Sequence, residues 1–321
     1  MANFFKAIFS NKEANPEEEK NRNEEKNFDI LKYDGMRAQR MCGKLPYAIK
    51  CFTEALNLRE DAETRTHLAA AYLSAGKPAE ALEQMDRLVE LEPEKVETRL
   101  MRIQVLFLND RDADVPAECR RILELDAANS QAYYQMAKAK KSLGDLFGAI
   151  ADLTRAIALK DDFSEAYQLR AEILLAMRQG AEALEDMEKV IALNPEEETA
   201  YLLRGRIHEL TGETDKAEAD FRKVVELNPF NTEAYVQLSR MFSALGKNGE
   251  ALECLDEAIE TLPDAAPLYA ERGRIRNLGG DKKGAFDDLK KSIELNPGGE
   301  AAQLCNGQHS NFDNLYKGGI F

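Results

Sequence analysis

Hydrophobic and small residues recur along this chain at helical spacing, in short stretches separated by turn signals. In the segment 232–265, the first stretch carries four such residues at positions i, i+3, i+4 and i+7: Tyr235, Leu238, Ser239 and Phe242. Gly246 ends this stretch, and Pro263 follows a second one because proline is disfavoured within a helix. The pattern predicts two antiparallel helices joined by a short turn.

This helix pair repeats every 34 residues. Four series of residues keep that step: Tyr133, Tyr167, Tyr201, Tyr235 and Tyr269; Pro195, Pro229, Pro263 and Pro297; Ala149, Ala183, Ala217, Ala251 and Ala285; and Gly212, Gly246 and Gly280, with Gly144 and Gly76 on the same grid. The grid predicts seven repeats between 62 and 299, and residues 29–61 fit as an eighth that is one residue short. Repeat 96–129 is the most degenerate, since Arg99 replaces the tyrosine and Val115 the alanine, so we expect a local irregularity there.

The repeat motif resembles that of the tetratricopeptide repeat family. The resemblance rests on the 34-residue period, the Tyr-x-x-[Leu/Arg]-[Gly/Ala] opening, the turn glycine, the mid-helix alanine and the terminal Asn-Pro, and it covers residues 29–299. It implies an all-α fold, a right-handed α-solenoid superhelix of about eight helix-turn-helix repeats. It also implies a non-enzymatic scaffold or adaptor that holds a peptide of another protein.

Charge and chemistry narrow the class of partner. The 321 residues include 43 Lys and Arg against 58 Asp and Glu, and the net charge of -15 disfavours nucleic acid as a partner. Five cysteines form no CxxC pair, which favours a reducing, cytoplasmic environment. The three histidines lie far apart in the sequence, so we expect no metal, cofactor or catalytic site, and His208 is expected to pack inside its repeat.

The two ends lie outside the repeat grid. Residues 1–9 form a short apolar segment that predicts either a docking motif or a weak membrane contact, and residues 10–28 are expected to be a disordered charged tether. A membrane-proximal assembly factor tethered by residues 1–9 is therefore the alternative function. Residues 300–321 are expected either to cap the last repeat, residues 306–321 covering its hairpin, or to act as a linear motif for another protein.

The resemblance implies that the first helix of each repeat lines a concave groove. The outward position on these helices holds Arg37, Ala70, Gln104, Lys138, Glu172, Arg206, Arg240 and Arg274. We expect the last three arginines to form a ladder that selects an acidic or phosphorylated segment of a partner, because a guanidinium can take a carboxylate or phosphate with two hydrogen bonds. Tyr134, Lys138 and Lys141 are further candidates. The alternative is that these side chains only solvate an inner face.

A second series of charged residues predicts structural ion pairs. Four arginines each precede an acid by sixteen residues, which joins the two helices of one repeat: Arg102 and Glu118, Arg170 and Asp186, Arg204 and Asp220, and Arg272 and Asp288. Where the first member is apolar, as at Leu68 and Leu238, the second is Gln84 or Cys254; Met136 with Asp152 is the exception.

Overall fold

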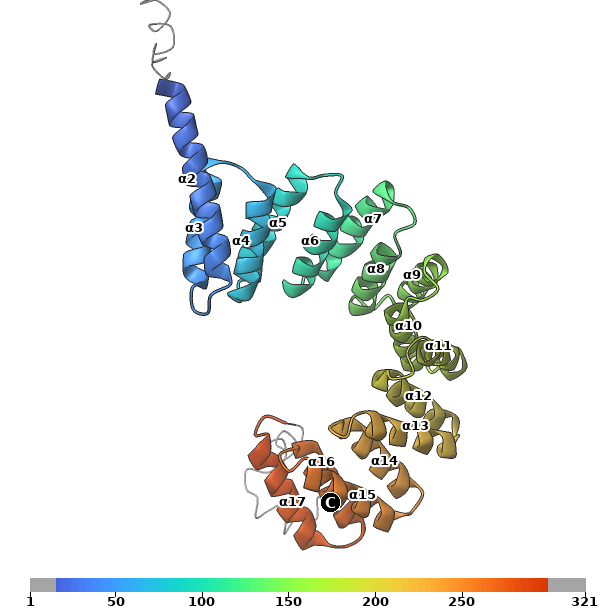
Figure 1. Cartoon of the computed structure of the whole chain (residues 1–321). Helices are drawn as coiled ribbons and strands as arrows, with labels where there is room; N and C mark the ends of the chain where they lie inside the picture. The colour runs from blue at the N-terminus through green and yellow to red at the C-terminus, as the bar shows by residue number, and fades with distance from the viewer. Residues whose placement is uncertain (1–15, 300–321) are drawn as a thin grey trace, which may run out of the picture. The chain divides into compact units, whose positions relative to one another are not determined.

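A computed structural model describes residues 16–299, which contain α-helices, one 3₁₀ turn and no strand (Figure 1). The helices are α2 (Pro16–Gln39), α3 (Leu45–Leu58), α4 (Ala62–Ser74), α5 (Pro78–Leu91), α6 (Val96–Leu108), α7 (Val115–Leu125), α8 (Ser130–Ser142), α9 (Leu146–Leu159), α10 (Ser164–Ala176), α11 (Gly180–Leu193), α12 (Glu198–Thr211), α13 (Thr214–Leu227), α14 (Thr232–Ala244), α15 (Asn248–Thr261), α16 (Ala266–Leu278) and α17 (Lys282–Leu295).

These helices pack as successive hairpins, from α2 with α3 to α16 with α17. The prediction of an all-α solenoid of eight helix hairpins is confirmed over the described range. The chain forms two compact units, Met1–Lys160 and Asp161–Phe321, which we call unit 1 and unit 2. Each unit contains four hairpins, and within a unit the second helix of one hairpin packs against the first helix of the next.

The two helices of a hairpin approach closely because small residues of the first helix face large ones of the second. A Cβ atom added to Gly205 would lie 2.6 Å from the Phe221 ring, and one added to Gly35 would lie 2.6 Å from the Phe52 ring. Both phenylalanines are fully buried. Glycine at these positions therefore supplies room for the neighbouring helix, which offsets its low helix propensity.

Seven of the described hairpins share one turn geometry, in which a residue with positive φ follows the first helix. These residues are Gly76, Asp110, Gly144, Arg178, Gly212, Gly246 and Gly280. After α10, for example, the Arg178 N–H donates to the Leu175 carbonyl at 2.9 Å and the Gln179 N–H to the Leu174 carbonyl at 2.8 Å, as in a Schellman motif. The seven turn residues, five of which are predicted turn glycines, thus help to satisfy the last carbonyls of their first helices.

The hairpin α6/α7 contains the irregularity expected in repeat 96–129. A 3₁₀ turn at Asp112–Asp114 precedes α7, which is three residues shorter than α5. Arg99, which replaces the repeat tyrosine, donates from Nη2 to the carbonyl of Pro93 at 2.8 Å. The Tyr201 hydroxyl donates to the equivalent carbonyl of Pro195 at 3.2 Å, so the arginine keeps the bond that fixes the start of the first helix.

The first hairpin differs from the expectation for the N-terminal segment. We expected residues 10–28 to be disordered, but α2 already begins at Pro16. Glu, Lys and Arg, which fill this stretch, have high helix propensity, and Phe28 anchors the helix because its side chain is 1% exposed and lies 3.8 Å from the Arg59 guanidinium. Residues 1–9 and 300–321, with the tether and capping roles expected of them, lie outside the described residues.

Two of the turn residues with positive φ, Asp110 and Arg178, are not glycine, and Arg178 has φ 61°. The left-handed conformation costs a residue with a side chain about 1 to 2 kcal/mol, and glycine avoids this cost. Part of the stability gained with glycine is lost again, because glycine has a larger conformational entropy in the unfolded chain. We expect Arg178→Gly to raise the free energy of unfolding by about 1 kcal/mol, measured by urea denaturation.

Gly212→Arg is the matched control, because it places the same side chain at the same turn position one hairpin later. No atom lies within 4 Å of a Cβ added there, so backbone strain alone should lower the stability of this variant. An Arg178→Gly variant no more stable than the wild type would contradict the interpretation.

Candidate functional site

The first helices of unit 2 present one charged residue each at the equivalent outward position. Glu172 lies on α10, Arg206 on α12, Arg240 on α14 and Arg274 on α16, at steps of 34 residues. The side chains of these four residues are exposed or half-exposed. They form the row that the sequence indicated for the groove.

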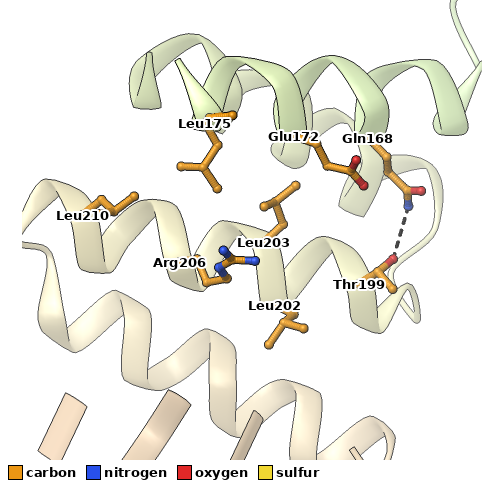
Figure 2. A pocket seen from close by; sticks show the side chains of 9 residues that line it. Gln168, Glu172, Leu175, Thr199, Leu202, Leu203, Arg206 and Leu210 are labelled. Carbon is orange, nitrogen blue, oxygen red and sulfur yellow. Dashed lines mark hydrogen bonds between the residues drawn. The ribbon is translucent and has the colours of Figure 1, made fainter. Parts of the chain in front are cut away.

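A pocket of about 550 Å³ lies between α10 and α12, beside this row. Figure 2 shows Leu175 and Glu172 projecting from α10 toward α12, and Leu203 projecting back from α12. The apolar lining of the pocket consists of four leucines and Ala176, and its charged groups are Glu172 and Arg206. Leu210 is 71% exposed at one end, and at the other the Gln168 amide donates to the Thr199 hydroxyl at 3.4 Å.

The three predicted groove arginines are not equivalent in the structure. Arg240 Nε lies 3.2 Å from one oxygen of Glu271, and Arg274 Nη2 lies 2.6 Å from the other oxygen. The Glu271 side chain is 4% exposed, so both arginines neutralise one buried carboxylate. Among the described residues Arg206 makes no hydrogen bond, and its electrostatic neighbour is Glu209.

The carboxylate of Glu271 was missed by the sequence analysis. Its signal is its position on α16, three residues before Arg274, a spacing that brings two side chains together on a helix. Glu209 lies near Arg206 and Arg240, which lower its pKa, but burial has the larger effect and raises the pKa of the carboxyl above its usual value.

The remaining groove candidates belong to unit 1. Tyr134, Lys138 and Lys141 all lie on α8, and the Lys138 ammonium is 4.6 Å from the centre of the Phe107 ring of α6. This cation–π contact holds the lysine over the neighbouring hairpin. The structure therefore assigns these residues and the three arginines to different units.

The four predicted ion pairs are present as contacts between the two helices of a hairpin. Arg102 Nη1 lies 2.8 Å from Glu118, and Nη2 lies 2.6 Å from the acid in each of the other three: Arg170 with Asp186, Arg204 with Asp220, and Arg272 with Asp288. Those three arginines also donate from Nε to the second carboxylate oxygen, which makes the pairs bidentate. The four acids are buried while the arginines remain partly exposed.

The exception noted in the sequence has a structural solution. Met136 cannot pair with Asp152, but Lys140 lies one turn further along α8 and its Nζ is 2.6 Å from Asp152. Arg276 reaches Asp288 from the equivalent position on α16 at 2.9 Å. His208 occupies this position on α12, where it is 5% exposed and its Nε2 lies 3.8 Å from Asp220, so it packs inside its repeat.

Cysteines and possible metal ligands are the other side chains of the described range that could form a reactive site. Burial raises the pKa of Cys119 to about 12 and that of Cys254 to about 11, so both thiols are protonated and weakly nucleophilic at neutral pH. Within residues 16–299, no three His, Cys, Asp or Glu side chains come together to hold a metal ion. No helix of the same range has the length and apolar character needed to cross a membrane.

The clamp between Arg204 and Asp220 leads to a quantitative prediction. Asp220 is 4% exposed, and removal of one partner of a buried pair leaves the other charge without compensation. We expect Arg204→Ala to lower the free energy of unfolding by roughly 3 kcal/mol. A double-mutant cycle with Asp220→Ala should show coupling above about 1 kcal/mol.

Arg222 and Glu218 on α13 provide the control cycle, because this exposed pair at 2.8 Å should couple by less than about 0.5 kcal/mol. Equal coupling energies in the two cycles would show that burial of the acid does not matter.

Comparisons with known proteins agree with this architecture. This chain is similar to the solved structure of a tetratricopeptide repeat protein from Parabacteroides merdae. The sequence identity is 18% and the TM-score 0.60, and the match covers 76% of this chain and 97% of that one. PilW, described as a widely conserved type IV pilus biogenesis factor, shows 18% identity and a TM-score of 0.56 over 66% of this chain and 98% of its own. Identities this low establish the fold alone.

Family models extend the comparison to the sequence. Two models described as tetratricopeptide repeat match the chain, one over residues 67–131 and 169–232 and the other over residues 130–163 and 232–264. The matches together cover more than half of the 321 residues. Curated protein sequences give no match. The repeat motif, the hairpin structure and the family models together place this chain in the tetratricopeptide repeat family.

Proposed function

We propose that this protein is an interaction scaffold whose unit 2 holds a peptide segment of a partner protein between α10 and α12. The observation that carries the proposal is the leucine-lined pocket with two charged side chains at its walls. Ligand sites combine apolar walls with a few polar groups that fix orientation. Tetratricopeptide repeat proteins serve in general as non-enzymatic scaffolds that bind other proteins.

The apolar part of the pocket supplies the affinity in this proposal. Leu210 is 71% exposed, and Leu175, Leu202 and Leu203 are half-buried. Full burial of a leucine side chain contributes about 1.5 to 3 kcal/mol, so a bound peptide that buries these leucines would be stabilised in the complex. The pocket volume of about 550 Å³ suits one or two side chains of a peptide more than a whole domain.

The charged part of the surface supplies the selectivity. Arg206 is the arginine of the outward position that lines the pocket, and it favours a partner segment with a carboxylate or phosphate group. The net charge of -15 makes nucleic acid a poor partner, because phosphates would be repelled by most of the surface. A cytoplasmic partner fits the unpaired cysteines of the described range.

Selection from a phage-displayed library of random twelve-residue peptides tests the proposal directly. We expect the full chain to enrich peptides that lose at least about tenfold in affinity to Leu210→Asp, because a charge then replaces an apolar contact. Fluorescence polarisation of labelled synthetic peptides measures that affinity.

Leu278→Asp is the matched control, since Leu278 has the same repeat position on α16, is 61% exposed and lies outside the pocket. It should leave the affinity unchanged. Enrichment of no peptide, or equal loss in both variants, would overturn the proposed function.

A further inference from the structure

We propose that a second pocket of unit 2, between α13 and α15, binds an arginine side chain of a partner protein over the ring of Tyr235. This pocket has a volume of about 650 Å³, and its lining comes from α13, α14 and α15. It shares no lining residue with the pocket between α10 and α12. The inference therefore goes beyond the proposed function and does not depend on it.

The other three hairpins of unit 2 each place an arginine of their own over the repeat tyrosine. The guanidinium carbon lies 5.4 to 5.8 Å from the centre of the ring: Arg170 over Tyr167, Arg204 over Tyr201 and Arg272 over Tyr269. Each of these arginines also pairs with the buried acid of its hairpin. A guanidinium between a tyrosine ring and a carboxylate is thus the common arrangement at this place of the repeat.

The hairpin α14/α15 keeps the tyrosine but lacks the arginine. Leu238 has the position of the arginine and Cys254 that of the acid, and both line the pocket. Among the described residues no cation lies over the Tyr235 ring, and its hydroxyl makes no hydrogen bond. The hydroxyls of Tyr201 and Tyr269, by contrast, each donate to a carbonyl six residues earlier. The pocket thus exposes a ring that an arginine covers in the other three hairpins.

The charges around the pocket favour a cationic ligand. Its charged lining residues are Arg222, Glu226, Glu250, Glu253 and Glu257. Three of them have partners of opposite charge: Arg222 with Glu218 at 2.8 Å, Glu226 with Lys223 at 2.8 Å, and Glu250 with Lys247 at 3.3 Å. Glu253 and Glu257 are exposed, lie one turn apart on α15, and have no ion pair within the described part of the chain. These two carboxylates remain for a ligand.

Glu257 is also a residue in which this hairpin differs from the other three of unit 2. They have lysine at its position, namely Lys189, Lys223 and Lys291. Loss of the arginine and of its acid leaves the charge of the hairpin unchanged, whereas glutamate in place of lysine makes it more negative. Burial raises the pKa of the Tyr235 phenol above its usual value, and the charges of Cys254 and Glu257 add to the rise, so this carboxylate lies near the exposed ring.

An arginine fits this pocket better than a lysine. A planar guanidinium can stack on an aromatic ring and take a carboxylate with two hydrogen bonds, whereas an ammonium is a point charge. Leu238 and Phe242 are each 3% exposed and form an apolar floor for the stem of the side chain. Arg222 does not occupy the place over Tyr235, because its guanidinium lies over the Phe242 ring at 5.8 Å.

Subtractive selection from the phage-displayed random library tests the inference with the full chain. The library is first depleted on Glu257→Lys, and the remaining phage are selected on the wild type. We expect a consensus that contains an arginine. In fluorescence polarisation at about 0.15 M salt, where exposed charges are screened beyond about 8 Å, a lysine in place of that arginine should weaken binding and an alanine should abolish it.

The double variant Leu238→Arg with Cys254→Asp restores the arrangement of the other three hairpins. Its own arginine should fill the pocket, so the consensus peptide should bind at least about tenfold more weakly, as it should to Glu257→Lys. Glu260→Lys is the matched control, because it makes the same change of charge on α15 outside the pocket and should leave the affinity unchanged. Circular dichroism and urea denaturation check that each variant is folded.

The outcomes separate this inference from the proposed function. A consensus without arginine, full affinity of the double variant, or an equal loss in Glu260→Lys overturns the inference, and so does the absence of any peptide that depends on Glu257. Peptides that lose affinity to Leu210→Asp belong to the pocket between α10 and α12. Their presence or absence decides the proposed function alone.

Discussion

The close approach of the two helices within each hairpin is the constraint on which the rest of this structure depends. Gly205 admits the Phe221 ring at a distance that no side chain would allow. In α6/α7 the sizes are exchanged, since Ile103 faces the second helix from the position of Gly205, and Cys119 holds that of Phe221. In both hairpins a larger residue on one helix is thus combined with a smaller one on the other, as dense packing requires.

The ion pairs follow from this packing. Arg204 and Asp220 are the residues immediately before Gly205 and Phe221, so the charges meet where the helices are already closest. A buried acid is tolerated only with a partner, and the partner comes from whichever residue of the first helix can reach it. Lys140 serves Asp152 for this reason, although it lies one turn beyond the usual arginine position.

The hairpins then determine which charges remain for a ligand. The arginine before the small residue, such as Arg204 before Gly205, points toward the second helix and pairs with a buried acid there. The residue after the small one, such as Arg206, points away from the second helix. At that outward position Arg240 and Arg274 are drawn to Glu271, and Arg206 keeps its donors beside a leucine-lined pocket. In the proposed function, binding and stability use neighbouring residues of the same helix turn, so we expect a substitution to affect one without the other.

The sequence by itself determined the elements of this protein, and the tertiary structure decided the roles of its charges. The hairpins, their turns and the sixteen-residue pairing of Arg204 with Asp220 could be predicted because packing within a hairpin recurs every 34 residues and leaves a periodic record. The role of Glu271, the use of Lys140 and the helical start at Pro16 depend on which side chains meet across helices, and Phe28 and Arg59 meet only in the fold. A repeat pattern reports the contacts that all repeats share, whereas a binding site is made by the side chains in which one repeat differs from the next.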